Sequence, residues 1–572
     1  MRLVRIAGAV LAAAFLAALA VSAGASEGGG SRPAADLIVS DAKIWTGDAR
    51  RPQAQALAVL DGRIVAVGDD PDVMAWRGPS THVVMAAGRR LVPGFNDAHV
   101  HLVLGGTALD SLQLHDVTSA EEFARRIGER AAHTPKGEWL LGGNWDETLW
   151  QKPVLPTRQL IDSVAADVPV SMGRYDAHMI VVNSLALKLA GITAATPDPP
   201  GGVIVRDAQG EPTGALKDAA ATLVQSIIPP PSQQQRRAIV ERALRHAASL
   251  GVTSLQDMSL PDHAADYANL AVYSELREEG RLTARIYAVP ALAGVEDFAK
   301  LGIRHDFGDE FLRVGALKAF ADGSVGSRTA YFIEPYSDNA ASRGLIGEDL
   351  QPLSLARARM QRADAAGLQL CTHAIGDGAI SAVLDLYAEV AAANGTRDRR
   401  LRIEHAQHLG AGDFDRFARL GVIASVQPYS IIDDGRWIGA RIGSDRAART
   451  YAFRTMLEHG VHLAFGTDWP VSPLDPMQTL YAATTRATLD GLNPKGWISE
   501  QKLTIAEALA AYTQGSAYAE FQDAAKGTLR PGALADFVLL SADVLAIPPE
   551  QLREVKVLKT WVGGRLVYDA VP

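Results

Sequence analysis

The chain is organised around the stretch Leu91-Val92-Pro93-Gly94-Phe95-Asn96-Asp97-Ala98-His99-Val100-His101. Its first two residues are typical of a buried strand, and the Pro-Gly pair that follows interrupts regular strand pairing. In extended backbone the two histidines point to the same face, because side chains alternate with a period of two. Two neighbouring imidazoles supply half of a metal site. A pair of ordinary surface or core histidines is the alternative that this motif alone leaves open.

The same pattern, an apolar run that ends in a polar residue and leads into a helical stretch, recurs along the chain. After the strand before His99, seven further runs follow it, at residues 252–257, 285–290, 314–322, 368–373, 401–405, 422–427 and 463–468. Helical stretches such as 233–250 and 353–366 separate most of them. Eight parallel strands with helical crossovers predict an α/β fold, a TIM-type (β/α)8 barrel over residues 91–525. A doubly wound open sheet is the alternative.

Ionisable residues stand at the ends of these strands and not at their beginnings. They are His99 and His101 on the first strand, Lys318 on the fourth, His373 on the fifth, His405 on the sixth and Asp468 on the eighth. Barrel active sites lie at the face where the strands end. We therefore expect these six side chains to converge and to build two adjacent metal positions.

Both ends of the mature chain read as sets of short strands. Residues 36–90 contain two apolar runs around Asp61-Gly62, which predicts a hairpin, and residues 526–572 follow a similar pattern. Neither set can bury its apolar face alone, so we predict one composite β-sandwich, with two unrelated hairpins as the alternative. Residues from about 104 to 216 are too long for an ordinary βα loop and are predicted to be an insertion after the first barrel strand.

The N-terminal segment is predicted to be a signal peptide over residues 1–25. Arg2 and Arg5 precede an apolar run over 6–21, and Ala23-Gly24-Ala25 offers a small-residue cleavage site. An uncleaved anchor is the alternative. Residues 26–35 would form a flexible leader. The protein is therefore expected to be exported, either periplasmic or secreted.

Composition excludes several classes of function. The chain of 572 residues is 48% hydrophobic and 21% charged, as globular proteins are. A net charge of −9 without a basic run argues against nucleic acid as a partner, and against membrane association after signal cleavage. Cys371 is the single cysteine, so no intramolecular disulfide can form. A homo-oligomer is left open. No motif of a serine hydrolase, zincin or thiol redox protein is present.

Taken together, the strand-end motifs resemble the amidohydrolase superfamily, specifically amidohydrolase family 3, the YtcJ-like branch. The resemblance covers nearly the whole mature chain. Its motifs are PGFNDAHVH at 93–101, KAFADGSVGSR at 318–328, THAIGD at 372–377, RIEHA at 402–406 and GTDWP at 466–470.

The resemblance implies a divalent metal centre with one or two ions, and it assigns a role to each strand-end residue. His99, His101 and Asp468 would bind one metal, and His373 and His405 a second, with Lys318 bridging the two as a CO2-derived carbamate. A plain lysine paired with an acid, and a single bound metal, is the alternative. Nitrogen and carboxylate ligands favour zinc, with manganese, iron or cobalt also able to serve.

The implied reaction is hydrolysis of an amide-type C–N bond, other than a peptide bond, in a small-molecule substrate. N-acyl, N-formyl and cyclic amides are the candidates. A metal-activated water attacks the carbonyl, and Asp468 takes its proton and passes it to the leaving amine. An esterase, carbamate hydrolase or lactonase with the same metals is one alternative. A non-catalytic exported metal- or solute-binding protein is the other.

Candidate substrate-binding residues come from two insertion segments, 142–147 and 174–178, that resemble family elements lining the mouth of the pocket, and from the motif after the fourth strand. They are Trp145, Arg174, His178, Asp322 and Arg328. The last four would orient a polar or anionic group of the substrate. A structural hydrogen bond or salt bridge is the alternative for each.

Overall fold

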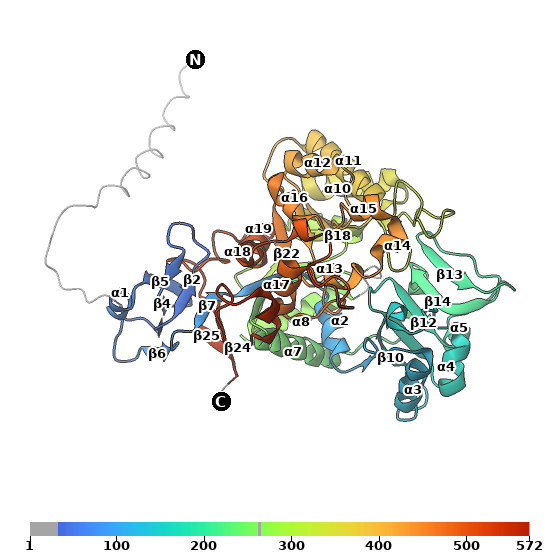
Figure 1. Ribbon diagram of the computed structural model, residues 1–572, viewed down its shortest axis with the longest axis horizontal. Helices are drawn as coiled ribbons and strands as arrows, with labels where there is room; N and C mark the ends of the chain where they lie inside the picture. The colour runs from blue at the N-terminus through green and yellow to red at the C-terminus, as the bar shows by residue number, and fades with distance from the viewer. Residues whose placement is uncertain (1–32, 261–264, 571–572) are drawn as a thin grey trace, which may run out of the picture.

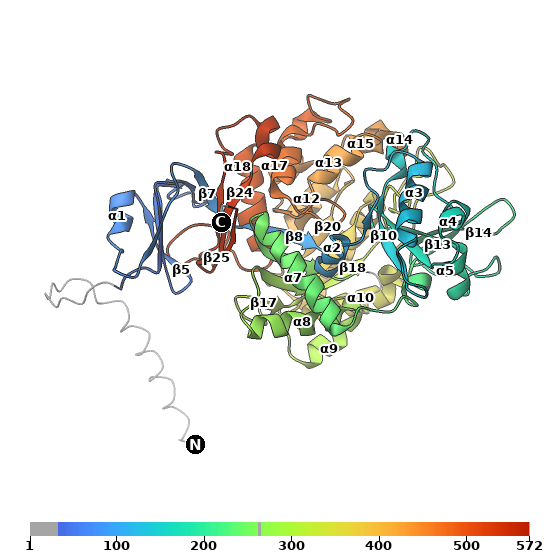
Figure 2. The same cartoon turned by 90° about the horizontal axis from the view of Figure 1, so that it is seen from below.

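The computed structural model describes residues 33–260 and 265–570 (Figure 1). The predicted signal peptide 1–25 and most of the leader 26–35 lie outside the described residues. Within the described ranges, no helix has the length and apolar character needed to cross a membrane. Three parts follow one another across the molecule: strands from both chain ends at one side, a central set of parallel strands with helices around it, and the insertion at the other side (Figures 1 and 2).

The centre consists of two parallel sheets. The first has the order β17-β16-β15-β8 and the second the order β18-β19-β20-β21-β22. Their strands are β8 (Phe95–Val100), β15 (Val252–Met258), β16 (Arg285–Val289), β17 (Leu312–Val314), β18 (Ala316–Phe320), β19 (Gln369–Ala374), β20 (Arg402–His405), β21 (Ile423–Val426) and β22 (Leu463–Phe465). Isolated parallel bridges, Ala291 with Lys318 and Val100 with Trp469, link the two sheets. The arrangement is an α/β fold of TIM-barrel type.

The central strands are covered on both faces, as parallel strands usually are. Every residue of β8, β15, β19, β20 and β21 is buried. Helices such as α7 (Gln233–Ser249), α10 (Leu353–Ala365) and α11 (Asp377–Asn394) lie around the outside (Figure 1). Their buried apolar side chains, such as those of Val240, Met360 and Val383, share one core with the strands. The two helices predicted at 233–250 and 353–366 are thereby confirmed.

The fourth predicted strand, residues 314–322, is divided in the structure. β17 ends at Val314 and pairs with β16, whereas β18 begins at Ala316 and pairs with β19. Gly315 stands between them, and a Cβ there would lie 2.4 Å from the carbonyl oxygen of Arg304. The break therefore falls where the chain passes from one sheet to the other, at a residue packed too closely to carry a side chain. Asp322 lies beyond the end of β18.

Strands from the two chain ends share one sheet. Its order is β25-β24-β23-β7-β2-β3, and a four-stranded sheet, β5-β4-β1-β6, lies beside it. The strands are β1 (Leu37–Ser40), β2 (Lys43–Trp45), β3 (Gln53–Ala54), β4 (Ala56–Leu60), β5 (Arg63–Gly68), β6 (His82–Met85), β7 (Arg90–Pro93), β23 (Phe537–Leu540), β24 (Val557–Val562) and β25 (Arg565–Asp569). Both sheets contribute side chains to one cluster, for example Leu57 and Trp561. The hairpin predicted at Asp61-Gly62 is confirmed by the antiparallel pairing of β4 and β5.

The stretch 91–101 passes between two sheets. Leu91 and Val92 belong to β7 of the terminal sheet and not to the barrel, whose first strand begins at Phe95. Gly94 makes the change: a Cβ at this position would lie 2.1 Å from Oγ1 of Thr253 on β15. The Pro-Gly pair thus separates two strands, where the sequence suggested the end of one.

The insertion has a sheet of its own, which the sequence did not predict. Its order is β13-β14-β12-β11-β10-β9. The strands are β9 (Leu112–Gln113), β10 (Leu140–Trp145), β11 (Val170–Arg174), β12 (Met179–Val182), β13 (Gly202–Arg206) and β14 (Pro212–Asp218). α3 (Ala120–Ala131) and α4 (Arg158–Ala165) pack on it with side chains such as Phe123 and Ile161. This unit stands against the end of the barrel where the strands finish (Figure 1).

Candidate metal centre

The two histidines of the opening stretch meet Asp468 at the barrel end. Nε2 of His99 lies 3.4 Å and Nε2 of His101 lies 3.2 Å from Oδ1 of Asp468. One donor atom from each of the three residues falls within 4.8 Å of the others, and all three residues are buried. His101 follows β8 as the N-cap residue of α2 (Leu102–Ala108). A histidine pair from the first strand and a carboxylate from the end of the eighth therefore face one point.

The other three predicted ligands lie beside this group. Nζ of Lys318 is 3.3 Å from Nε2 of His99. The ring centroid of His405 is 4.8 Å from that of His99 and 4.5 Å from that of His373. The structure thus brings together all six strand-end side chains.

The backbone turns sharply at two of these residues. His405 has φ +71° and Asp468 has φ +60°, in the left-handed region that side chains other than glycine seldom adopt. The amide of Asp468 donates to the carbonyl of His99 at 2.7 Å, which ties the eighth strand end to the first. Strained conformations persist where surrounding contacts hold them, and they concentrate at functional sites.

Three of these imidazoles, those of His99, His101 and His405, are each oriented by a partner at Nδ1. His99 Nδ1 lies 2.7 Å from Oε2 of Glu404, and His101 Nδ1 lies 2.9 Å from the carbonyl of Met258. His405 Nδ1 lies 2.8 Å from Oε1 of Gln427. These oxygens accept the Nδ1 proton, so the Nε2 lone pair faces the centre.

Sequence reasoning assigned no role to these orienting residues. A signal for two of them was present: Glu404 stands next to a predicted ligand in the RIEHA motif, and Gln427 ends the seventh predicted strand as the ligands end theirs. Met258 acts through its backbone carbonyl, for which a sequence carries no signal.

The protonation states suit metal ligation. Burial lowers the pKa of His99 to about 4 and that of His405 to about 3, so both imidazoles are neutral at pH 7. Burial raises the pKa of the Asp468 carboxyl, but the imidazoles of His99 and His405, which are protonated in the acid range where this carboxyl titrates, hold it below its ordinary value, so the carboxylate is ionised at pH 7. Metal binding requires neutral imidazole and ionised carboxylate.

A divalent ion fits this donor set. Oδ1 of Asp468 is buried and accepts no hydrogen bond from any residue in the described ranges. A buried oxygen without a partner requires an explanation, and an ion held with two imidazole nitrogens supplies one. His99, His101 and Asp468 would hold that ion, and Lys318, His373 and His405 stand where a second could bind.

Replacing Gln427 with methionine should weaken metal binding by about ten- to hundredfold, because His405 loses the acceptor that orients its ring. Competition with a chromogenic chelator measures the affinity. Gln427→Glu is the matched control, since it keeps an oxygen at the same length. Unchanged affinity in Gln427→Met would show that His405 does not depend on this contact.

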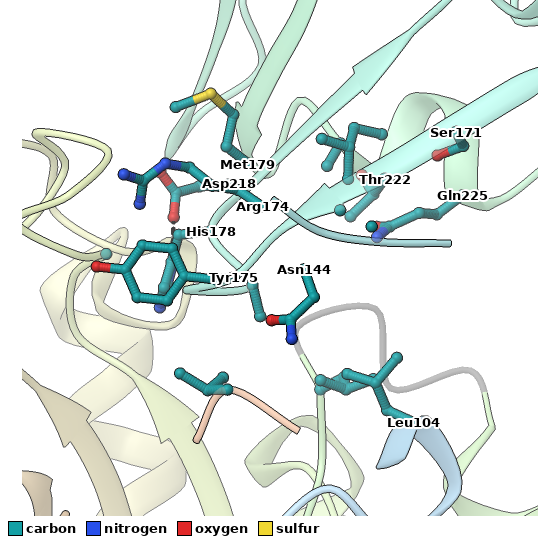
Figure 3. Close-up of a pocket in the computed structure, with 18 of the residues that line it drawn as sticks. Leu104, Asn144, Ser171, Arg174, Tyr175, His178, Met179, Asp218, Thr222 and Gln225 are labelled. Carbon is teal, nitrogen blue, oxygen red and sulfur yellow. Dashed lines mark hydrogen bonds and ion pairs between the residues drawn. The ribbon is translucent and has the colours of Figure 1, made fainter. Parts of the chain in front are cut away.

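A cavity of about 310 Å³ opens between the barrel and the insertion (Figure 3). Its lining combines α2, three barrel loops and the insertion, and includes Leu104, Asn144, Arg174, Tyr175, His178, Asp218, Phe320, Asp322 and Pro470. The ring centroids of His178 and Phe320 lie 5.0 and 5.4 Å from that of His373. The cavity therefore adjoins the metal centre.

Three of the five predicted substrate-binding residues line this cavity, namely Arg174, His178 and Asp322. Trp145 does not, which corrects the expectation: its indole is fully buried in the insertion core, and its N–H donates to the Met172 carbonyl at 3.1 Å. β10 points the ring away from the cavity, so the ring packs in the core of the insertion.

Arg328 also lies outside the lining, a second correction. Its guanidinium pairs with Asp338 at 2.8 Å, and 37% of its side chain is exposed. The backbone has φ +57° at Arg328, which turns the chain there. Arg328 therefore forms a salt bridge, the structural alternative that its sequence motif left open.

Comparison with known proteins places the chain in a family. The profile of the "Amidohydrolase family" matches residues 82–568. YtcJ of Bacillus subtilis, an amidohydrolase by name, is 32% identical over 518 residues, which cover 90% of this chain and 96% of YtcJ. The N-substituted formamide deformylase of Arthrobacter pascens is 30% identical over 553 residues, covering 93% and 98% of the two chains.

A solved structure supports the same fold. An uncharacterized metal-dependent hydrolase from Pyrococcus horikoshii superimposes with a TM-score of 0.73 at 27% identity, covering 90% of this chain and 99% of its own. The fold, the convergent ligand set and the sequence matches agree with the resemblance seen in the motifs. This chain belongs to the amidohydrolase family of metal-dependent hydrolases.

Proposed function

We propose that this protein hydrolyses an amide-type C–N bond, other than a peptide bond, in a small molecule. The observation that carries the proposal is the convergence of six metal-ligating or basic side chains beside a 310 Å³ cavity. The relative from Arthrobacter pascens, a deformylase of N-substituted formamides by name, supports this bond type. A bound divalent metal, which this nitrogen and carboxylate set suggests is zinc, lowers the pKa of a water molecule and polarises a carbonyl.

Asp468 is the proton carrier in this proposal. Its pKa lies below its ordinary value, so the carboxylate is ionised at pH 7. It could then accept a proton from the attacking water, whose acidity a bound metal would increase. As the C–N bond breaks, its electron pair stays on nitrogen, and Asp468 delivers the proton there. Its position between His99 and His101 holds the carboxylate at the reacting point.

Lys318 is proposed to carry a carbamate. Burial lowers the pKa of its amine to about 8, which increases the neutral form that attacks CO2. Carbamate formation joins the amine nitrogen to the CO2 carbon and releases a proton. Within the described ranges, no carboxylate lies within 4.0 Å of Nζ, whereas an ordinary buried ammonium would need one. An unmodified Lys318 with one metal is the alternative.

Metal-dependent amide hydrolysis can be tested with purified, metal-replete protein. A panel of N-formyl, N-acyl and cyclic amides, with esters, carbamates and lactones beside them, should show turnover on an amide. A chelator should abolish turnover and zinc should restore it. Turnover confined to esters, carbamates or lactones would favour an esterase, carbamate hydrolase or lactonase. Metal binding without any turnover would favour a non-catalytic metal- or solute-binding protein.

The cavity favours an uncharged substrate over the anionic group that the sequence suggested. Arg174 is the one lysine or arginine among the described lining residues. Its guanidinium bonds Glu147 twice, at 2.8 and 3.1 Å, and Asp176 at 2.8 Å. Asp218 and Glu348 add carboxyl groups to the lining.

A matched pair of substrates checks the charge preference. We expect an N-benzyl amide to have kcat/KM about tenfold or more above its 4-carboxybenzyl counterpart, because like charges placed together are costly. The comparison uses steady-state rates on one preparation. A preference for the carboxylate would mean that a cation in the cavity is free to bind it.

We further propose export of the mature chain, supported by the signal-peptide pattern of residues 1–25. N-terminal sequencing of protein recovered outside the cytoplasm would locate the cleavage site.

For the fold, we propose a closed barrel and one composite β-sandwich from residues 36–90 and 526–572. The sheet shared by β7 and β23 supports the second of these.

A further inference from the structure

The insertion carries a histidine–carboxylate pair to the edge of the metal centre (Figure 3). His178 immediately precedes β12, and Asp218 ends β14, its antiparallel neighbour. The amide of Asp218 donates to the carbonyl of His178 at 3.0 Å. Nδ1 of His178 lies 2.7 Å from Oδ1 of Asp218. Backbone and side chain thus both hold the pair together.

This contact determines which ring nitrogen faces the cavity. Because Asp218 holds Nδ1, Nε2 is the nitrogen left for a ligand, and it has no hydrogen-bond partner among the residues the structure describes. The ring centroid of His178 lies 5.0 Å from that of His373. Asp218 has φ +46°, a costly conformation for aspartate, and its carboxylate lies at the Nδ1 edge of the ring.

Two other charged side chains that line the cavity, those of Arg174 and Asp322, already have partners. Arg174 is bonded to Glu147 and Asp176. Asp322 accepts three backbone N–H groups, from Tyr331, Ile375 and Gly376, at 2.8 to 3.0 Å. His178 therefore combines nearness to the centre with a free polar atom.

We propose that Nε2 of His178 accepts a hydrogen bond from the N–H of the scissile amide, and that Asp218, which accepts the Nδ1 proton, is its positioning residue. The insertion then contributes a catalytic residue to a site whose metal ligands all come from the barrel. This inference rests on the proposed function. It adds a hydrogen bond and leaves bond breaking and proton transfer as described for Asp468.

Kinetics of three variants test the role. His178→Ala should lower kcat/KM about ten- to hundredfold at unchanged metal content, the usual cost of leaving a buried hydrogen-bonding group without its partner. Added imidazole should restore part of the loss, because the ring-sized space is left open beside the cavity. Asp218→Asn should cost about tenfold, chiefly in kcat, since the ring is retained but poorly held.

His133→Ala is the matched control, because His133 is an exposed histidine of the insertion and is not among the residues that line the cavity. It should leave kcat/KM unchanged. Wild-type rates in His178→Ala would overturn the inference. So would a loss of activity that follows a loss of metal, because His178 would then only support His373.

A chemical measurement keeps the two proposals separable. Diethyl pyrocarbonate should modify Nε2 of His178, and N-benzylacetamide should slow that modification, as read by peptide mass spectrometry. Protection of His178 without hydrolysis of any amide would refute the proposed function and support this binding role. Hydrolysis of amides, with His178 unreactive or unprotected, would refute this inference alone.

Discussion

Asp468→Asn should lower turnover by roughly two to four orders of magnitude, the usual contribution of a positioned general acid–base group. The asparagine keeps the shape of the side chain and one oxygen donor, but it has no basic site to accept the proton of water. His99, His101, Lys318, His373 and His405 stay in place around it, so most of the metal should remain bound. The effect should therefore fall on kcat.

The test requires metal content and rate from the same preparation, because lost metal would imitate lost proton transfer. Asp322→Asn is a useful comparison, since Asp322 also lies beside His373 but is bonded to three backbone amides. Asp322→Asn should disturb the loops whose backbone amides it bonds more than it lowers kcat. If Asp468→Asn raised KM and left kcat intact, another group would have to carry the proton.

Lys318→Ala should weaken metal binding by about 100-fold or more and reduce activity in parallel, because the proposed carbamate of Lys318 would bridge two ions and its loss would affect both. The side chain is almost fully buried, with Nζ 3.3 Å from Nε2 of His99 and 4.8 Å from the centre of the Phe320 ring. Acetate or propionate should partly restore metal content and rate by occupying the vacated space.

Lys526→Met provides the control for lost stability. Lys526 is also buried, but it pairs with Glu520 at 2.8 Å, away from the metal centre. Its loss should lower the melting temperature and leave the metal content of folded protein unchanged. Full activity in Lys318→Ala would exclude an essential bridge, and metal loss without any rescue would favour a purely structural lysine.

Much of the candidate site could be predicted because its residues follow a local rule. Each ligand stands at or just after the end of an apolar run, and the ends of parallel strands meet at one face. His373 on β19 and His405 on β20 show this directly: both strands are buried along their length, and both finish at the centre. The hairpin between β4 and β5 was readable for the same reason, since its turn is encoded by adjacent residues.

The substrate side of the site was predicted less well. Trp145 and Arg174 both come from insertion segments that resemble family elements, yet the first packs in the core and the second lines the cavity between acidic partners. Strand β10 is kinked at Asn144, which has φ +63°, and side-chain direction after such a kink cannot be read from alternation. The six-stranded insertion sheet was missed because it mixes parallel and antiparallel pairs, which no regular alternation of strands and helices along the chain announces.

The sequence by itself determined the family, the parallel α/β core and the six candidate ligands, because these depend on hydrophobic periodicity and on motifs of a few adjacent residues. Only the tertiary structure decided the remainder. It showed Glu404 and Gln427 behind the imidazoles, the passage at Gly94 from one sheet to another, and the pairing of His178 with Asp218. Contacts between residues far apart in the chain depend on how whole elements pack, which no local pattern specifies.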